Sequence, residues 1–175
     1  LWEGRVNVSK SATNVDIENR EISWKVTFNV PAEGLTYAKI VDTHPTAWFD
    51  NANHSEKLLA DSVNVTGLLP DESFLVRPDN DTQTSIKFYK AKEQKKANEG
   101  LLPTAEGRTV TVEFKTEIDD TWFEASKATT YLQNHVNNIK LYVNEDSGKP
   151  AQDTAVVVPN PIIKTGNYVG SRNVN

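Results

Sequence analysis

Strict alternation of apolar and polar residues is the strongest constraint on the fold of this chain. In the segment EISWKVTFNV every second residue is apolar, namely Ile22, Trp24, Val26, Phe28 and Val30. Successive side chains of a β-strand point to opposite faces, so this pattern gives one buried face and one solvated face. The segment RTVTVEFKTEI repeats the pattern. Each segment therefore predicts a half-buried strand.

Three further segments continue this pattern: LTYAKIVD, TYLQNHVNNIKLYVN and DTAVVVP. In TYLQNHVNNIKLYVN the apolar residues lie at even positions up to Val136 and at odd positions from Ile139 onward. One extra residue would keep both sets on the same face, which predicts a β-bulge near Asn137 and Asn138. Clusters of Pro, Gly, Asn and Asp separate the segments, as in NVPAEG, LLPDES, RPDNDTQ and LLPTAEG. Short strands separated in this way predict an all-β fold, an antiparallel β-sandwich. The segment KAKEQKKANEG, residues 90–100, instead predicts one short, charged surface helix that ends at a glycine.

Composition excludes several classes of function. Apolar residues make up 37% and charged residues 25% of the 175 residues, as in soluble globular domains. The net charge is −5 and no basic block occurs, so we expect no nucleic-acid partner. No apolar run approaches the roughly 20 residues of a transmembrane helix, so we expect no membrane insertion. Because cysteine is absent, disulfides and cysteine-ligated zinc are excluded.

The end of the chain resembles its beginning. VNVSKSATNVDIENREI and PIIKTGNYVGSRNVN both contain an apolar strand pattern, a lysine followed by a small hydroxyl residue, and a polar turn. Lys164 would then correspond to Lys10. We expect residues 1–159 to form one domain and residues 160–175 to form a linker and the first strand of a similar domain. Tandem domains of the same chain are the expected partners.

Three polar residues occupy positions that should face the interior. Lys10 follows Val6 and Val8 in phase, Asp42 follows Ala38 and Ile40, and Asn134 lies between Leu132 and Val136. A buried lysine and aspartate can form an ion pair, which is the simplest interpretation.

A second interpretation uses all three residues. Burial shifts Lys10 toward a neutral, nucleophilic amine and Asp42 toward a neutral acid. The amine can then attack the carboxamide of Asn134 while the acid polarises its carbonyl, and the product is an isopeptide bond with loss of ammonia. Asn137 and Asn138 are the alternatives if the bulge lies earlier. The reaction occurs once within one molecule, so we expect no enzyme activity.

The succession VSKS, EISWKVTFN, AKIVDTHP, TYLQNHV and AVVVPNPIIKTG resembles the Ig-like domains of Gram-positive cell-wall-anchored adhesins and pilins, of the collagen-adhesin and antigen I/II C-terminal types. This resemblance covers nearly the whole chain and is weakest over residues 51–107. It implies an Ig-like sandwich, an isopeptide bond with the acid in Val41-Asp42-Thr43-His44-Pro45, and a location on the bacterial cell wall. In the asparagine motif the chain departs from the family, because Tyr131 lies three residues before Asn134 and Val136 replaces the usual alanine.

The resemblance implies a stalk module that supports host attachment. The alternative is a binding domain whose sandwich loops contact a host glycoprotein or glycan. Trp48 and Phe49 are either capping residues of the core or an exposed aromatic contact, and we expect capping.

The remaining polar clusters give weaker indications. Asp79, Asn80 and Asp81 offer oxygen ligands for calcium, but no bidentate glutamate follows at EF-hand spacing, so we expect a solvated turn and no metal or cofactor. His44, His54 and His135 are too scattered for a metal site, and we expect the segment FDNANHSE to be a polar loop. The carboxylates of EIDDTWFE, namely Glu117, Asp119, Asp120 and Glu124, suggest a glycosidase. We interpret that segment instead as a loop whose aromatic residues close the sandwich.

Overall fold

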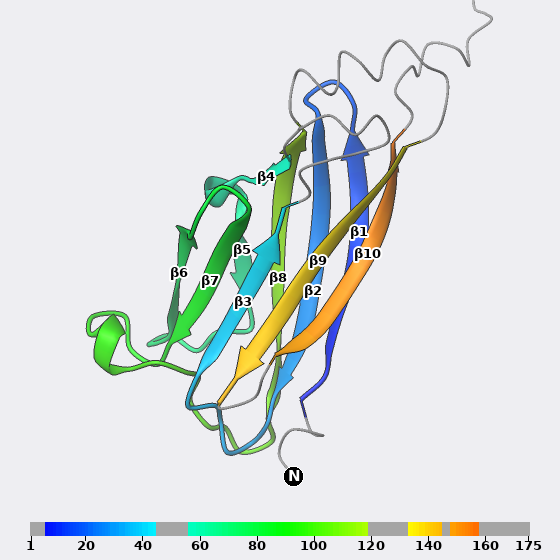
Figure 1. Cartoon of the computed structure of the whole chain (residues 1–175). Helices are drawn as coiled ribbons and strands as arrows, with labels where there is room; N and C mark the ends of the chain where they lie inside the picture. Colours follow the sequence, from blue (N-terminus) through cyan, green and yellow to red (C-terminus); the bar gives the residue numbers. More distant parts are fainter. Residues whose placement is uncertain (1–5, 45–55, 119–132, 145–147, 158–175) are drawn as a thin grey trace, which may run out of the picture.

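Two antiparallel β-sheets packed face to face make up the fold (Figure 1). The structure is a computed structural model that describes residues 6–44, 56–118, 133–144 and 148–157. The first sheet contains β1 (Val8–Asp16), β2 (Glu21–Val30), β8 (Arg108–Ile118), β4 (Glu56–Leu58) and β5 (Asn64–Thr66). The second sheet has the order β10 (Lys149–Val157), β9 (Gln133–Val143), β3 (Ala38–Thr43), β7 (Gln83–Tyr89) and β6 (Ser73–Pro78). The predicted all-β sandwich is confirmed.

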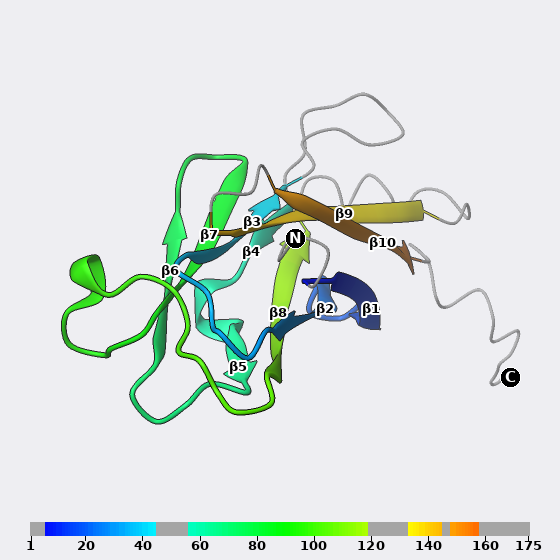
Figure 2. The same ribbon diagram turned by 90° about the horizontal axis from the view of Figure 1, so that it is seen from below.

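The core lies between the two sheets, which Figure 2 shows as layers with β9 and β10 above β1 and β2. All five alternating apolar residues of β2 are buried, as the sequence predicts: Ile22, Trp24, Val26, Phe28 and Val30. They pack with the inner residues of β3, β7, β8 and β9 in one hydrophobic cluster. Burial of this apolar surface is the main source of stability of the sandwich.

The two sheets meet along the edge formed by β1 and β10. The Asp153 carboxylate of β10 accepts a hydrogen bond of 2.8 Å from the backbone N–H of Ala12 in β1. A register shift between Ala12 and Asn14 in the pairing of β1 with β2 lies at this point. The first strand is therefore held both by β2 and by the last described strand.

β9 pairs with β10 and with β3 in one continuous register, without a bulge. The bulge predicted near Asn137 and Asn138 is therefore wrong. His135 and Asn137, and not only apolar residues, occupy inner positions of this strand and are buried. The prediction failed because it assumed that every inner position would be apolar, whereas buried polar residues are accommodated where other polar groups face them.

The segment 90–100 contains a single 3₁₀ turn, η3 (Lys95–Ala97), in place of the short surface helix that the sequence predicts. A second 3₁₀ turn, η2 (Ala60–Ser62), follows β4. The predicted turn RPDNDTQ connects β6 to β7, and the Asn80 side chain accepts a hydrogen bond from the backbone N–H of Thr82 within it. No helix in the described part of the chain is long and apolar enough to cross a lipid bilayer.

Candidate functional site

Lys10 points from β1 into the sandwich, where its cross-strand neighbour in β2 is Val26. Its Nζ lies 3.6 Å from the centre of a Trp24 ring and 5.5 Å from that of Phe114. The Nζ atom is buried and has no hydrogen-bond partner. Burial lowers the pKa of Lys10 to about 7, and attraction to Asp42, Asp153 and Glu56 only partly opposes this effect. A large share of the amine is therefore neutral near pH 7.

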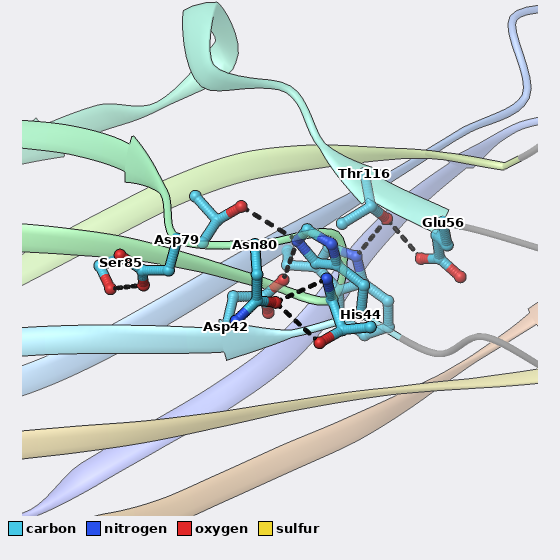
Figure 3. Close-up of polar contacts among 10 residues, drawn as sticks. Asp42, His44, Glu56, Asp79, Asn80, Ser85 and Thr116 are labelled. Atoms are coloured by element: carbon cyan, nitrogen blue, oxygen red, sulfur yellow. Dashed lines mark hydrogen bonds and ion pairs between the residues drawn. The ribbon is translucent and has the colours of Figure 1, made fainter.

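Asp42 lies on the inner face of β3 and is fully buried. Neither of its carboxyl oxygens makes a hydrogen bond of regular geometry, and the Nε2 atom of His44 lies 3.5 Å from Oδ2 (Figure 3). Burial raises the pKa of Asp42 to about 7, against the opposing effects of Lys10 and Asn137. The carboxyl can thus hold a proton at neutral pH, as a general acid requires.

Asn137 on β9 is the asparagine that the described residues place beside this acid. Asp42 pairs with Ile139, so Asn137, two residues earlier on the same face, is its diagonal cross-strand neighbour. The Asn137 side chain is 1% exposed, and neither its oxygen nor its nitrogen has a hydrogen-bond partner. It is close enough to lower the pKa of the Asp42 carboxyl. The Lys10 amine and the Asn137 carboxamide thus both lie close enough to Asp42 to lower the pKa of its carboxyl.

The other two candidate asparagines differ in position from Asn137. Asn138 follows it on β9 and is exposed. Asn134 pairs with Val156 in the β9–β10 ladder, but its side chain lies outside the described residues. Its position along the strand is in phase with the exposed Val136 and Asn138, not with Asn137. Of the predicted set, the structure thus brings together Lys10, Asp42 and the alternative asparagine.

A second buried polar group lies in the same interior, and sequence reasoning missed it. Glu56 of β4 is 1% exposed and accepts a hydrogen bond of 2.5 Å from the Thr116 hydroxyl (Figure 3). The Thr116 oxygen accepts a hydrogen bond of 2.9 Å from the indole N–H of Trp24, and His135 Nδ1 lies 3.0 Å from Glu56. We call this chain of hydrogen bonds from Trp24 through Thr116 to Glu56 the relay; it orients the indole that covers Lys10. Thr116 and His135, polar residues at inner strand positions, were the only available signal for it.

The chemistry of these three groups allows one condensation reaction. A neutral Lys10 amine can attack the side-chain carbonyl carbon of Asn137, while the protonated Asp42 carboxyl donates a hydrogen bond to the carbonyl oxygen. Leaving an amine, an acid and a carboxamide buried without hydrogen bonds is unfavourable. An amide in their place carries no charge and can share hydrogen bonds with the acid.

The remaining predicted residues that the structure describes do not form a second site. Asp79 accepts a hydrogen bond from the Ser85 hydroxyl (Figure 3), and Asp81 is exposed. Among the described residues no group of three His, Asp or Glu side chains is arranged to hold a metal ion. Glu117 lies in β8, opposite Glu21. Several other candidates lie outside the described residues: Trp48, Phe49, His54, Asp119, Asp120 and Glu124.

Comparisons with known proteins found similarity only among solved structures. No protein-family model and no curated protein matches the sequence. The collagen-binding subdomain of the Enterococcus faecalis surface protein ACE aligns with 87% of this chain and 95% of its own length, at 12% identity and a TM-score of 0.42. The fimbrial protein FimP of Actinomyces oris aligns with 86% of this chain and 37% of its own length, at 14% identity and a TM-score of 0.42. Such values describe a limited likeness of fold.

Proposed function

We propose that this chain is a structural module of a bacterial surface adhesin or pilus-type protein, stiffened by an isopeptide bond between Lys10 and Asn137. The module acts outside the cell as a stalk in series with similar domains and supports host attachment. The proposal is supported by a buried amine and a buried carboxamide that both influence one buried acid, while their polar atoms lack hydrogen-bond partners. The sequence resemblance to wall-anchored adhesins and pilins is in accord with it.

The cross-linking step needs no cofactor. The Nζ–Cγ bond forms between Lys10 and Asn137, and the Cγ–Nδ2 bond of the asparagine breaks. Asp42 gives its proton to the carbonyl oxygen as the tetrahedral intermediate forms and then carries the proton lost by the amine to the departing nitrogen, which leaves as ammonia. When the carbonyl re-forms, its oxygen returns the first proton to Asp42. The acid ends in its starting state, but lysine and asparagine are consumed. The step therefore happens once per molecule, and we propose no enzymatic turnover.

The position of this bond suits a protein under tension. Lys10 lies in β1 of the first sheet and Asn137 in β9 of the second sheet, so the bond connects the two layers near both ends of the described chain. A force applied to the chain ends would otherwise peel β1 and β10 from the sandwich by breaking hydrogen bonds one after another. With the bond present, the segment between residues 10 and 137 is bypassed and cannot be extended.

Intact-mass spectrometry tests the proposal. The wild-type chain should weigh one ammonia molecule less than its sequence predicts, and Lys10→Ala and Asn137→Ala should each have their full sequence mass. Asn138→Ala is the matched control, because it removes a neighbouring but exposed carboxamide and should keep the mass deficit. Asn134→Ala tests the other candidate asparagine: it should keep the mass deficit if Asn137 is the residue that reacts. A wild-type chain of full sequence mass would refute the cross-link.

A further inference from the structure

The outer face of the second sheet carries two rows of side chains across four strands. The pairing registers place Tyr142, Lys39, Lys87 and Leu75 side by side in the first row. They place Lys140, Val41, Ser85 and Arg77 in the second row. Four cationic side chains thus share one face of a chain whose net charge is −5.

Lys39 and Lys87 lie directly opposite each other on β3 and β7, and like charges in such a pair are destabilising. Lys87 is paired with Glu99, at 2.5 Å, and this hydrogen bond helps to raise the Lys87 pKa although burial opposes it. No ion pair within the described ranges involves Lys39, Arg77 or Lys140. The sheet therefore keeps an uncompensated positive charge where its own stability would favour an acidic or neutral residue.

Aromatic rings accompany these cations. Lys87 Nζ lies 5.0 Å from the centre of the Tyr37 ring and 5.7 Å from that of Tyr89, and Lys39 Nζ lies 5.6 Å from the Tyr142 ring centre. Such contacts hold long, flexible side chains in place over the sheet. The cations are consequently presented as a fixed array, which lowers the entropy that a ligand loses in ordering them.

Two neighbouring hollows lie on this face. One has a volume of about 150 Å³ and is lined by Lys39, Arg77 and Lys87 together with Tyr37, Ser85 and Asp79 among others. The other has a volume of about 390 Å³ and includes Val41, Lys140, Tyr142 and Pro150 in its lining. Both hollows border β3, because Lys39 and Val41 lie two residues apart on the same face of that strand. We call the part of the outer face that contains both hollows the trough.

We propose that this trough binds an anionic polysaccharide, a polymer of sugars that carry carboxylate or sulfate groups. The cations of the two rows would pair with its anionic groups, and the half-buried rings of Tyr37 and Tyr142 offer flat faces against which sugar rings can pack. The backbone groups of β3 and β7 are already paired on both sides within the sheet, so strand addition is possible only at the outer edges of β6 and β10 and not over the middle of the trough. The ligand must be recognised by side chains alone, and a long, regularly charged polymer suits such a trough. This site is independent of the proposed cross-link.

Binding can be measured by calorimetry with three size-matched probes: heparin oligosaccharides, hyaluronan oligosaccharides and neutral dextran. The wild-type chain should bind at least one of the two anionic probes and not the dextran, and its affinity should fall as salt is added. Lys39→Gln/Arg77→Gln should weaken this binding by about tenfold or more. Lys25→Gln/Lys57→Gln removes the same charge from exposed positions of the first sheet and should change the affinity less than about twofold.

Several results would overturn the proposal. These are absence of binding to both anionic probes, equal binding of dextran, or an equal loss of affinity in the control double variant. Tighter binding of a poly-glutamate peptide than of either oligosaccharide would show that the site takes acidic peptides instead. If Lys39→Gln/Arg77→Gln fails to fold, the exposed Lys140→Gln variant supplies the same test, and an unchanged affinity there would count against the trough.

Discussion

Replacement of Lys10 by methionine should cost the protein about 5 kcal/mol of its free energy of unfolding. The proposed bond closes a loop over the 127 positions that separate residues 10 and 137, and a closure of that length stabilises by about 5 kcal/mol in the chain-entropy model. Methionine keeps an unbranched stem against Trp24, so little packing is lost. For a domain of this size the loss corresponds to a fall in melting temperature of roughly 10–20 °C.

Scanning calorimetry and intact-mass spectrometry on the same sample provide the assay. Lys25→Met is the matched control, since Lys25 is exposed on the outer face of β2 and its loss should leave both the mass deficit and the melting temperature unchanged. A Lys10→Met chain that lacks the mass deficit but melts within about 3 °C of the Lys25→Met control would refute the loop-closure estimate.

The same variant should show a defined pH dependence. Without Lys10, burial still raises the pKa of the Asp42 carboxyl above its unfolded value of 3.8, and the attraction that lowered it is gone. A raised folded pKa means that the folded state binds the proton more tightly, so this stability is present below the unfolded pKa of 3.8 and is lost as pH rises from there toward the folded pKa. We therefore expect the free energy of unfolding of Lys10→Met, measured in urea, to fall below that of Lys10→Met/Asp42→Asn by more at pH 8 than at pH 5. Equal deficits at both values would contradict a neutral Asp42.

Three further substitutions test other parts of the structure, each by urea unfolding. Thr116→Val leaves the buried indole N–H of Trp24 and a buried carboxylate oxygen without partners, at an expected cost of roughly 3–5 kcal/mol; a change below 1 kcal/mol would show that the relay is dispensable. Glu72→Gln disrupts the bidentate ion pair in which Arg108 donates two hydrogen bonds of 2.6 Å to the Glu72 carboxylate. The loss should lower the free energy of unfolding by about 3 kcal/mol. Because the pKa of Glu72 lies below its usual value, the difference from wild type should shrink as pH falls through that pKa. Gly100→Ala places a methyl group 2.1 Å from a backbone oxygen at a φ of +103°, so it should cost about 2 kcal/mol or more.

The fold could be read from the sequence because its signal is local. Alternation within one strand reports which side chains face the core, and the phases expected for β2 and β8 agree with the burial found. The pairing of strands is not local. Nothing in the order of the segments indicates that β8 lies between β2 and the two short strands β4 and β5, or that β6 and β7 extend the second sheet. These pairings depend on packing between residues far apart in the chain.

The candidate site could be predicted where a polar residue takes the next inward-facing position after two alternating apolar residues. Lys10 and Asp42 each follow two apolar residues in phase, and both are found inside. The asparagine was harder to select, because the inner face of β9 itself carries polar residues, His135 and Asn137. Hydrophobic phase alone could not distinguish a bulge from polar residues that face a buried acid. Glu56 was assigned to a polar loop since its burial depends on Thr116 and His135, which come from distant strands.

The two proposed sites share strands but use opposite faces of them. Asp42 of β3 and Asn137 of β9 point inward, whereas Lys39 of β3 and Lys140 of β9 belong to the outer trough. A slip of one residue between strands would turn every side chain to the other face. The proposed covalent bond at Asn137 would prevent such a slip for β9 and would thereby also preserve the spacing of the cations across β9, β3 and β7. A cross-link buried in the core would in this way keep a ligand-binding surface in register while the domain carries load.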